Sequence, residues 1–286
     1  MTTLVSWVTY DQRGPASLYI ASDSRFSWEK RACWDSGRKI HFSNKYPVIL
    51  GFCGDVMFCS QVISQVISYI DACDIFEKDV NTDARFDLVF NLIKRSFGDY
   101  PVVFALESFQ ILYATRESRR CFHTYIIKWD KNKSKDQRWS TRKLSIPSQT
   151  DLIVTLGSGG RPYRKHYEEI YSKSEIGGLS RSFYSSLSSH IDSGKDPYTG
   201  GPIQLASLTN IGGSNALGVI KNNKRYLYGM EIDPHEKINN IRWVNDLFEN
   251  CDGNDVKRLK QAQVQPLPRN LNNPLGKNTK KIPLPR

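Results

Sequence analysis

The segment that directly follows the first methionine is the strongest constraint on the fold of this chain. Residues 2–10 read TTLVSWVTY and are rich in β-branched and aromatic side chains of near-alternating polarity, which predicts a β-strand. Chain ends are usually loosely held, so a strand that begins at residue 2 brings the terminus into the body of the fold. The terminus itself therefore becomes a candidate for a functional role.

The other patterns predict strands followed by pairs of helices. Strands are expected at 17–22, 39–42, 48–52, 101–115, 122–129, 151–156, 203–209, 215–220 and 225–232, and amphipathic helices at 55–72, 83–96, 162–173 and 179–191. Helices that occur in pairs, rather than between successive strands, argue against a parallel doubly wound sheet. The order predicts an α+β fold in which helix layers cover two antiparallel sheets.

The basic charge is concentrated in the last part of the chain. The net charge is +11, and residues 256–286 hold eight basic and no acidic residues, so subtracting eight from eleven leaves +3 for residues 1–255. The same stretch contains five prolines, a composition typical of a disordered or extended tail. A solvated tail and a docking tail for a partner or nucleic acid both remain open, whereas the near-neutral body does not favour nucleic acid.

Composition also predicts the compartment and the domain boundaries. No apolar run approaches the roughly 18 residues of a membrane span, and we expect no signal peptide. The six cysteines show no CxxC pair and no metal-ligand spacing, which predicts free thiols in a reducing compartment, the cytoplasm. We expect one domain over 2–255, with an insertion around 116–150 that has a charged loop tip.

Several common catalytic and binding patterns are missing. The glycine-rich stretch 157–160 lacks the lysine of a phosphate-binding P-loop, and no GxSxG motif is present. The cluster 233–236 has no second group of metal ligands. No histidine lies in a recognisable catalytic context; the five are His41, His123, His166, His190 and His235. We therefore expect no cofactor and no metal.

A nucleophile at the chain start needs no histidine. A free N-terminal threonine supplies both the attacking Oγ and an α-amine, with a pKa near ~7.7–8.0, that accepts the proton. Such a site needs a nearby cation that lowers the amine pKa, a carboxylate that holds the cation, and backbone donors for an oxyanion. Asp23, Lys39 and Gly54 follow Thr2 in that order, at strand ends or next to them.

Together these segments resemble the proteasome β-type subunits and the bacterial HslV peptidase, members of the N-terminal-nucleophile (Ntn) hydrolases. The first half carries the resemblance in TTLVS (2–6), ASDSR (21–25), RKI (38–40) and GFCG (51–54). In the second half, LGSGG (156–160) is similar to the family's GSG turn. DPYTGGP (196–202) is similar to its Asp-x-x-Ser-Gly-Gly element, and also to that of the bacterial Anbu relatives. The resemblance spans about residues 2–232.

The resemblance implies a role for each matching residue. Thr2 matches the nucleophile, exposed once Met1 is removed; Asp23 and Lys39 match the ion pair that tunes it; and Gly54 matches the oxyanion donor. The network around the threonine amine is matched by Ser158, Asp196 and Thr199, and the pocket for the residue before the scissile bond by Phe26, Gly37, His41, Phe52 and Val56. Phe52 at the pocket floor would favour small side chains.

The resemblance also implies a fold, a reaction and partners. The fold is the four-layer α-β-β-α sandwich of Ntn hydrolases, and the reaction is hydrolysis of peptides or unfolded proteins through an acyl-enzyme on Thr2. A self-compartmentalised homo-oligomeric ring, with an unfoldase or regulator as partner, is expected. Two departures are Thr199 in place of the usual serine and Asp55 in place of a small residue. A non-proteolytic Ntn amidohydrolase and a catalytically silent structural subunit that binds a partner through the tail remain alternatives.

Overall fold

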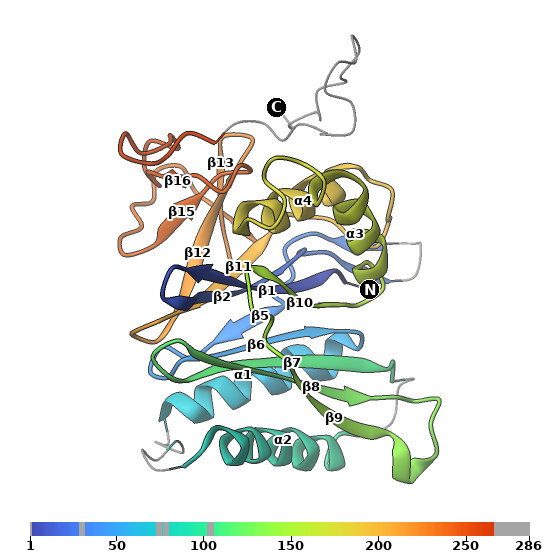
Figure 1. The fold of residues 1–286 in the computed structure, drawn as a ribbon. Helices are drawn as coiled ribbons and strands as arrows, with labels where there is room; N and C mark the ends of the chain where they lie inside the picture. Colours follow the sequence, from blue (N-terminus) through green and yellow to red (C-terminus); the bar gives the residue numbers. More distant parts are fainter. Residues whose placement is uncertain (1, 29–31, 73–75, 77–79, 102–105, 266–286) are drawn as a thin grey trace.

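The computed structural model describes residues 2–28, 32–72, 76, 80–101 and 106–265, which form a mixed α+β fold (Figure 1). The larger sheet contains β1 (Leu4–Asp11), β2 (Gly14–Ser22), β10 (Asp151–Leu156), β11 (Gln204–Thr209), β12 (Ser214–Lys221), β13 (Lys224–Leu227), β14 (Met230–Ile232), β15 (Arg242–Val244) and β16 (Asn250–Cys251). The second sheet contains β5 (Ile40–Phe42), β6 (Val48–Cys53), β7 (Phe109–Ser118), β8 (Cys121–Trp129) and β9 (Trp139–Leu144). A small hairpin pairs β3 (Phe26–Trp28) with β4 (Ala32–Trp34).

The helices fall into two pairs along the chain. They are α1 (Val56–Ala72), α2 (Thr82–Gly98), α3 (Gly160–His166) with the π-helical turn η2 (Tyr167–Tyr171), and α4 (Ser180–Asp192), besides the short 3-10 turn η1 (Lys135–Gln137). The predicted helix at 162–173 is thus observed as α3 continued by η2. Among the described residues, no helix is long and apolar enough to cross a membrane.

The strand order of the larger sheet places the chain start next to segments that carry other predicted site residues. The larger sheet runs β10-β1-β2-β11-β12-β13-β14, with β15 added beside β12. The second sheet runs β5-β6-β7-β8-β9. Among the described strands, every pair is antiparallel except β12 with β15. Because β1 lies between β10 and β2, the chain start is flanked by the ends of both neighbours.

The two sheets face each other through an apolar core. Successive side chains of a strand point to opposite faces, and both faces of β1 and β6 are buried. Leu4 of β1 and Ile49 of β6 point into the core between the sheets. Val5 of β1 and Leu50 of β6 point outward, each into a core beneath helices. This two-sided burial explains why the segment 48–52 is a continuous apolar run rather than an alternating one.

Helices cover the outer faces of both sheets (Figure 1). α1 and α2 pack on the second sheet, where Val62, Ile63 and Val89 meet the strands. α3 and α4 pack on the larger sheet through side chains such as Tyr163 and Phe183. The prediction of an α+β fold with antiparallel sheets and paired helices is therefore confirmed.

Two predicted boundaries differ from the structure. The segment 116–150, expected to be an insertion, supplies the end of β7, all of β8 and the edge strand β9 of the second sheet. The tail was expected to begin at 256, yet Leu259 N donates to Asn250 O at 2.9 Å and Gln265 N to a Glu249 carboxylate oxygen at 2.7 Å. Residues 256–265 thus contact the body, and the rest of the predicted tail, 266–286, lies outside the described residues.

Candidate active site

Thr2 is held in place by its backbone. β1 begins two residues later, where Leu4 pairs with the last residue of β2 and the last residue of β10. The carbonyl oxygen of Thr2 accepts a hydrogen bond from Gly159 N at 3.2 Å. Gly157 has a φ of +81°, and a Cβ there would lie 2.0 Å from that same oxygen. Only glycine therefore fits this turn, and the turn fixes where the Thr2 side chain lies.

Asp23 and Lys39 form a buried ion pair beside the chain start. The Lys39 ammonium donates to Asp23 Oδ1 at 2.8 Å, and both side chains are fully buried. Thr3 N donates to the same oxygen at 2.9 Å, so the ammonium lies next to the backbone nitrogen one residue after Thr2. The other oxygen, Oδ2, accepts from the backbone nitrogens of Arg25 and Gly200, each at 3.1 Å. The sequence prediction that these two side chains pair is therefore confirmed.

The surroundings of Lys39 act on its pKa in opposite directions. Burial lowers the pKa of the Lys39 ammonium below its ordinary value, while the Asp23 carboxylate raises it. The face of the Phe26 ring lies 5.6 Å from the ammonium nitrogen. Because burial is the largest effect, the lysine is a cation that can give up its proton more readily than a lysine in water.

A second, partly buried network ends on Thr3 rather than on Thr2. Thr199 Oγ1 donates to Asp196 Oδ2 at 2.6 Å, and it lies 2.7 Å from Thr3 Oγ1. Since the Thr199 proton points to the carboxylate, Thr3 is the donor in the second bond. A Cβ on Gly159 would lie 1.8 Å from Thr3 Oγ1, so this glycine packs directly on the network. The network fixes the neighbour of Thr2, and Thr199 keeps the hydroxyl that the usual serine would supply.

Gly54 closes β6 in a backbone conformation that other residues rarely adopt. Its φ is +101°, and a Cβ would lie 2.1 Å from the carbonyl oxygen of Ser108. The next residue, Asp55, caps helix α1 by accepting from Phe58 N at 2.9 Å, and it also accepts from Glu107 N at 3.1 Å. Asp55, which departs from the pattern of the family that the sequence resembles, thus caps α1 and also binds the backbone before β7.

The Gly54 conformation makes a prediction about stability. Replacement of Gly54 by alanine should lower the melting temperature clearly, because a strained φ costs on the order of 1–3 kcal/mol before the clash with the backbone is counted. Gly98→Ala is the matched control, since a Cβ at this position has no neighbour within 4 Å. Thermal unfolding followed by circular dichroism measures both variants. Equal melting temperatures for the two would contradict the prediction.

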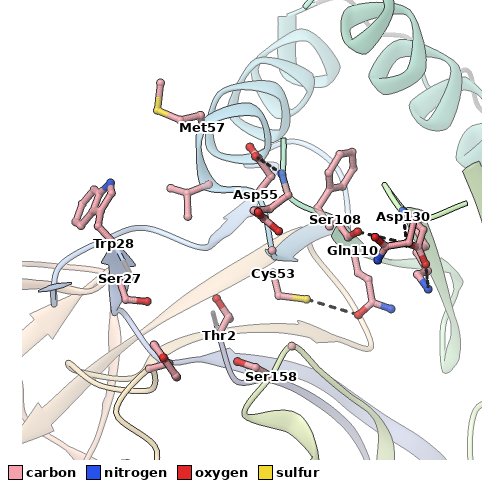
Figure 2. Close-up of a pocket in the computed structure, with 18 residues that line it drawn as sticks. Thr2, Ser27, Trp28, Cys53, Asp55, Met57, Ser108, Gln110, Asp130 and Ser158 are labelled. Carbon is pink, nitrogen blue, oxygen red and sulfur yellow. Dashed lines mark hydrogen bonds and ion pairs between the residues drawn. The ribbon is translucent and has the colours of Figure 1, made fainter. Parts of the chain in front are cut away.

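A cavity of about 800 Å³ opens at Thr2 (Figure 2). Of the residues predicted from sequence, it is lined by Thr2, Gly54, Val56 and Ser158. Figure 2 shows Thr2 and Ser158 on one side and Cys53 across from them. Further lining side chains to which the sequence assigned no site role include Cys53, Asp55, Ser108, Gln110 and Asp130. They come from the end of β6, the start of β7 and the loop after β8, which no local motif connects.

Cys53 is poorly suited to act as a nucleophile. Its Sγ lies 3.7 Å from the Gln110 side-chain oxygen, to which it donates. Burial raises the pKa of the Cys53 thiol to about 12, so the reactive thiolate is scarce at neutral pH. Cys53 therefore serves as part of the cavity wall.

Four of the five residues predicted to line the substrate pocket lie elsewhere. Phe26, Gly37, His41 and Phe52 are not among the residues that line the cavity. The Phe26 and Phe52 rings lie 6.3 Å apart in the core under α1, and a Cβ on Gly37 would lie 2.5 Å from the Phe26 ring. The Phe26 ring thus occupies the space between Gly37 and Phe52 where the pocket was expected. Only Val56 keeps its predicted place at the cavity.

His41 is neutral in this environment. Its side chain is buried, and burial lowers its pKa to about 3. It therefore cannot act as an acid at neutral pH.

No protein-family model matches this chain, and no curated protein matches it either.

Proposed function

We propose that this protein is an Ntn hydrolase that cleaves amide bonds in peptides, with Thr2 as its N-terminal nucleophile after removal of Met1. One observation carries the proposal. The fully buried Lys39 ammonium shares an Asp23 oxygen with the backbone nitrogen of Thr3, while Thr2 lines a cavity of about 800 Å³. A buried cation beside a freed amine is what N-terminal threonine chemistry requires.

The proposed reaction assigns a task to each group. The Thr2 amine takes the proton of its own Oγ, which attacks the carbonyl carbon, and the neighbouring Lys39 cation keeps that amine unprotonated by lowering its pKa. The N–H of Gly54, at the turn between β6 and α1, is the proposed donor to the oxyanion. The protonated amine then gives its proton to the leaving nitrogen, and water releases the acyl group from Oγ.

The arrangement of the layers supports the same assignment. Two facing sheets, each covered on its outer face by a helix pair, match the α-β-β-α sandwich expected for an Ntn hydrolase. The proposal includes the homo-oligomeric ring and the unfoldase or regulator that the resemblance implies, and places the enzyme in the cytoplasm. Light scattering on the purified chain tests the ring.

Intact mass spectrometry tests the proposal directly. The sample is measured with and without an electrophile that reacts with a hydroxyl next to a free amine. We expect a mass that lacks Met1, and a single adduct that disappears in Thr2→Ala. An adduct on molecules that keep Met1, or an adduct of the same yield in Thr2→Ala, would overturn the proposal.

A second candidate is an amidohydrolase that acts on small amides rather than peptides. The observation in its favour is that Phe26 fills the space expected for a substrate side chain. The two functions differ in substrate length, so hydrolysis of an unstructured protein such as casein, compared with that of a capped amino-acid amide, separates them. Peptide cleavage remains our first choice because the cavity is large enough for several residues.

The filled pocket predicts selectivity for small side chains. In a peptide library, glycine or alanine before the scissile bond should be cleaved faster than phenylalanine or tryptophan. Phe26→Val should shift the preference toward larger side chains, because it opens space next to Phe52 and Lys39. Phe42→Val is the control, since this buried ring lies in the core between the sheets. A wild-type preference for bulky aromatics, or the same shift in Phe42→Val, would contradict the prediction.

A further inference from the structure

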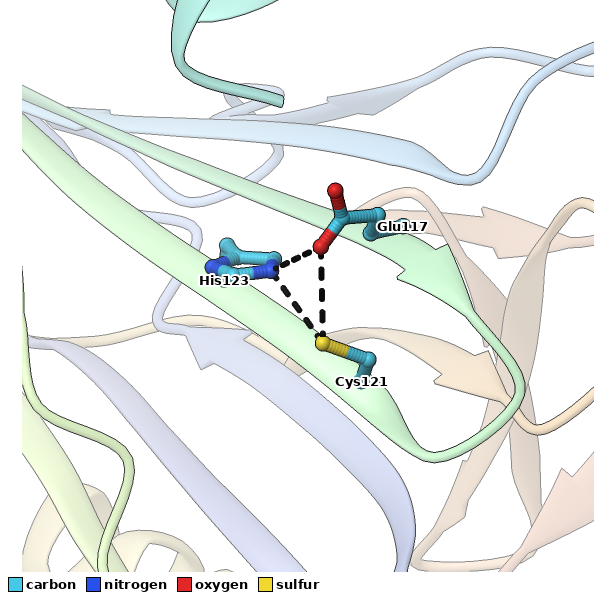
Figure 3. A group of neighbouring side chains, drawn as sticks. All are labelled: Glu117, Cys121 and His123. Atoms are coloured by element: carbon cyan, nitrogen blue, oxygen red, sulfur yellow. Dashed lines mark hydrogen bonds and ion pairs between the residues drawn. The ribbon is translucent and has the colours of Figure 1, made fainter. Parts of the chain in front are cut away.

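Three side chains with metal-binding atoms converge on the hairpin formed by β7 and β8 (Figure 3). Glu117, Cys121 and His123 each direct one ligand atom to a common point. His123 Nε2 lies 3.0 Å from Glu117 Oε2 and 3.3 Å from Cys121 Sγ, and the sulfur lies 3.6 Å from the same carboxylate oxygen. Within the described residues, this is the one group of three such side chains that meets so closely.

A β-bulge produces the convergence. Cys121 and His123 are two residues apart on β8 and so share one face of the sheet. On β7 the register shifts between Arg116 and Ser118, which makes Glu117 the extra residue of a bulge. Bulges re-aim side chains, and the carboxylate of Glu117 is directed onto the face that carries the other two groups. The spacing of these residues in the sequence matches no standard metal motif, which is why the sequence predicted no metal.

The hairpin turn is anchored to the body of the protein. Arg120 lies between the two strands with a φ of +66°. Its guanidinium donates to both carboxylate oxygens of Asp11, at 2.8 and 3.0 Å, and to the carbonyl oxygens of Gly14 and Pro15. The turn between β1 and β2 therefore holds the turn between β7 and β8. A fixed hairpin keeps the three ligand atoms together before any ion arrives.

The separations between the three atoms suit one tetrahedral ion. With ordinary zinc bond lengths, tetrahedral ligands lie about 3.3 Å apart for two N or O atoms and about 3.6 Å apart when one is sulfur. The observed separations of 3.0, 3.3 and 3.6 Å differ from these by no more than a few tenths of an ångström. Thiolate, imidazole and carboxylate are also the ligand types that Zn²⁺ takes in proteins.

We propose that Glu117, Cys121 and His123 form a binding site for Zn²⁺ or a similar divalent transition metal ion. Three protein ligands leave the fourth position for water. The Glu117 side chain is 48% exposed, so an ion can enter and leave from solvent. The site lies at the far end of β7 from Ser108 and Gln110, which line the Thr2 cavity, about 26 Å along the strand at ~3.3 Å per residue. It is therefore independent of the proposed hydrolysis.

Co²⁺ and Zn²⁺ titrations of the purified full-length chain test the site. We expect one Co²⁺ per chain, with intense visible bands of tetrahedral cobalt and a near-ultraviolet sulfur-to-cobalt charge-transfer band. Zn²⁺ should displace the cobalt. Cys121→Ser should lose the charge-transfer band, and His123→Gln and Glu117→Gln should each weaken Zn²⁺ binding about 10-fold or more, since loss even of an outer partner costs about 10- to 100-fold.

Matched control variants remove a thiol and an imidazole that lie outside the cluster. Cys33 and His235 are exposed and lie outside the cluster, so Cys33→Ala and His235→Ala should bind both metals like the wild type. Thr2→Ala should also bind metal normally, which separates this site from the proposed active site. The proposal fails if Cys33→Ala removes the charge-transfer band, or if Cys121→Ser and His123→Gln retain wild-type Zn²⁺ affinity.

Discussion

Replacement of Lys39 by methionine is expected to lower the turnover number for a peptide substrate at neutral pH about 10²- to 10⁴-fold, the range that general-base catalysis contributes, because the Thr2 amine would no longer serve as the base. Methionine has nearly the length of lysine but no charge. Without the cation beside Asp23, the Thr2 amine would be protonated at neutral pH and unable to accept the Oγ proton. The pH-activity profile should therefore move to higher pH, a shift that a purely structural role for Lys39 would not produce.

The same substitution is expected to destabilise the protein. Removing one partner of a buried ion pair costs about 3–5 kcal/mol, although Asp23 keeps hydrogen bonds from three backbone nitrogens. Leu18→Ala is the matched control, because Leu18 is fully buried in the core between the sheets and such a truncation costs about 2–5 kcal/mol. Rates and melting temperatures are measured for both variants well below unfolding. If Leu18→Ala loses as much activity as Lys39→Met, the loss reflects stability and the proposed role of Lys39 is wrong.

The ion pair could be predicted because its partners lie next to recognisable strands, in segments that resemble those of the Ntn hydrolases. Asp23 comes directly after the strand that pairs with β1, and Lys39 comes directly before β5, so the residue order already suggested their roles. The outer limits of the helices were predictable for a similar reason, since helical periodicity extends over many residues. A repeated apolar pattern over a long segment identifies a helix even where a single residue would fit either a helix or a strand.

Other features depend on packing that no local pattern encodes. The filled pocket arises because the Phe26 ring rests on Gly37, a contact between residues that the sequence placed around an open space. The edge strand β9 was missed because most of its side chains are exposed and polar. The cavity wall formed by Cys53 and Gln110 joins two strands whose register only the folded sheet reveals. Long-range register thus limits what sequence patterns can predict.

Replacement of Thr2 by alanine should abolish peptide hydrolysis, with a loss of at least about 10³-fold, because catalytic groups that act as one unit fail together when one is removed. Thr2→Ser should retain measurable activity, since serine keeps both the hydroxyl and the amine. Thr9→Ala, on the strand that follows Thr2, serves as the control, because Thr9 is half-buried and its hydroxyl donates to Ser17 O. Mass spectrometry must first establish that Met1 has been removed from each variant.

Retention of Met1 offers an independent test that changes no side chain. An amide nitrogen on Thr2 cannot accept a proton, so molecules that keep Met1 should be inactive although their hydroxyl is intact. Preparations with different extents of Met1 removal, made with and without a co-expressed methionine aminopeptidase, should show activity proportional to the processed fraction. Activity that stays constant across that series would place the nucleophile elsewhere. Full activity in Thr2→Ala would lead to the same conclusion, whatever the state of Met1.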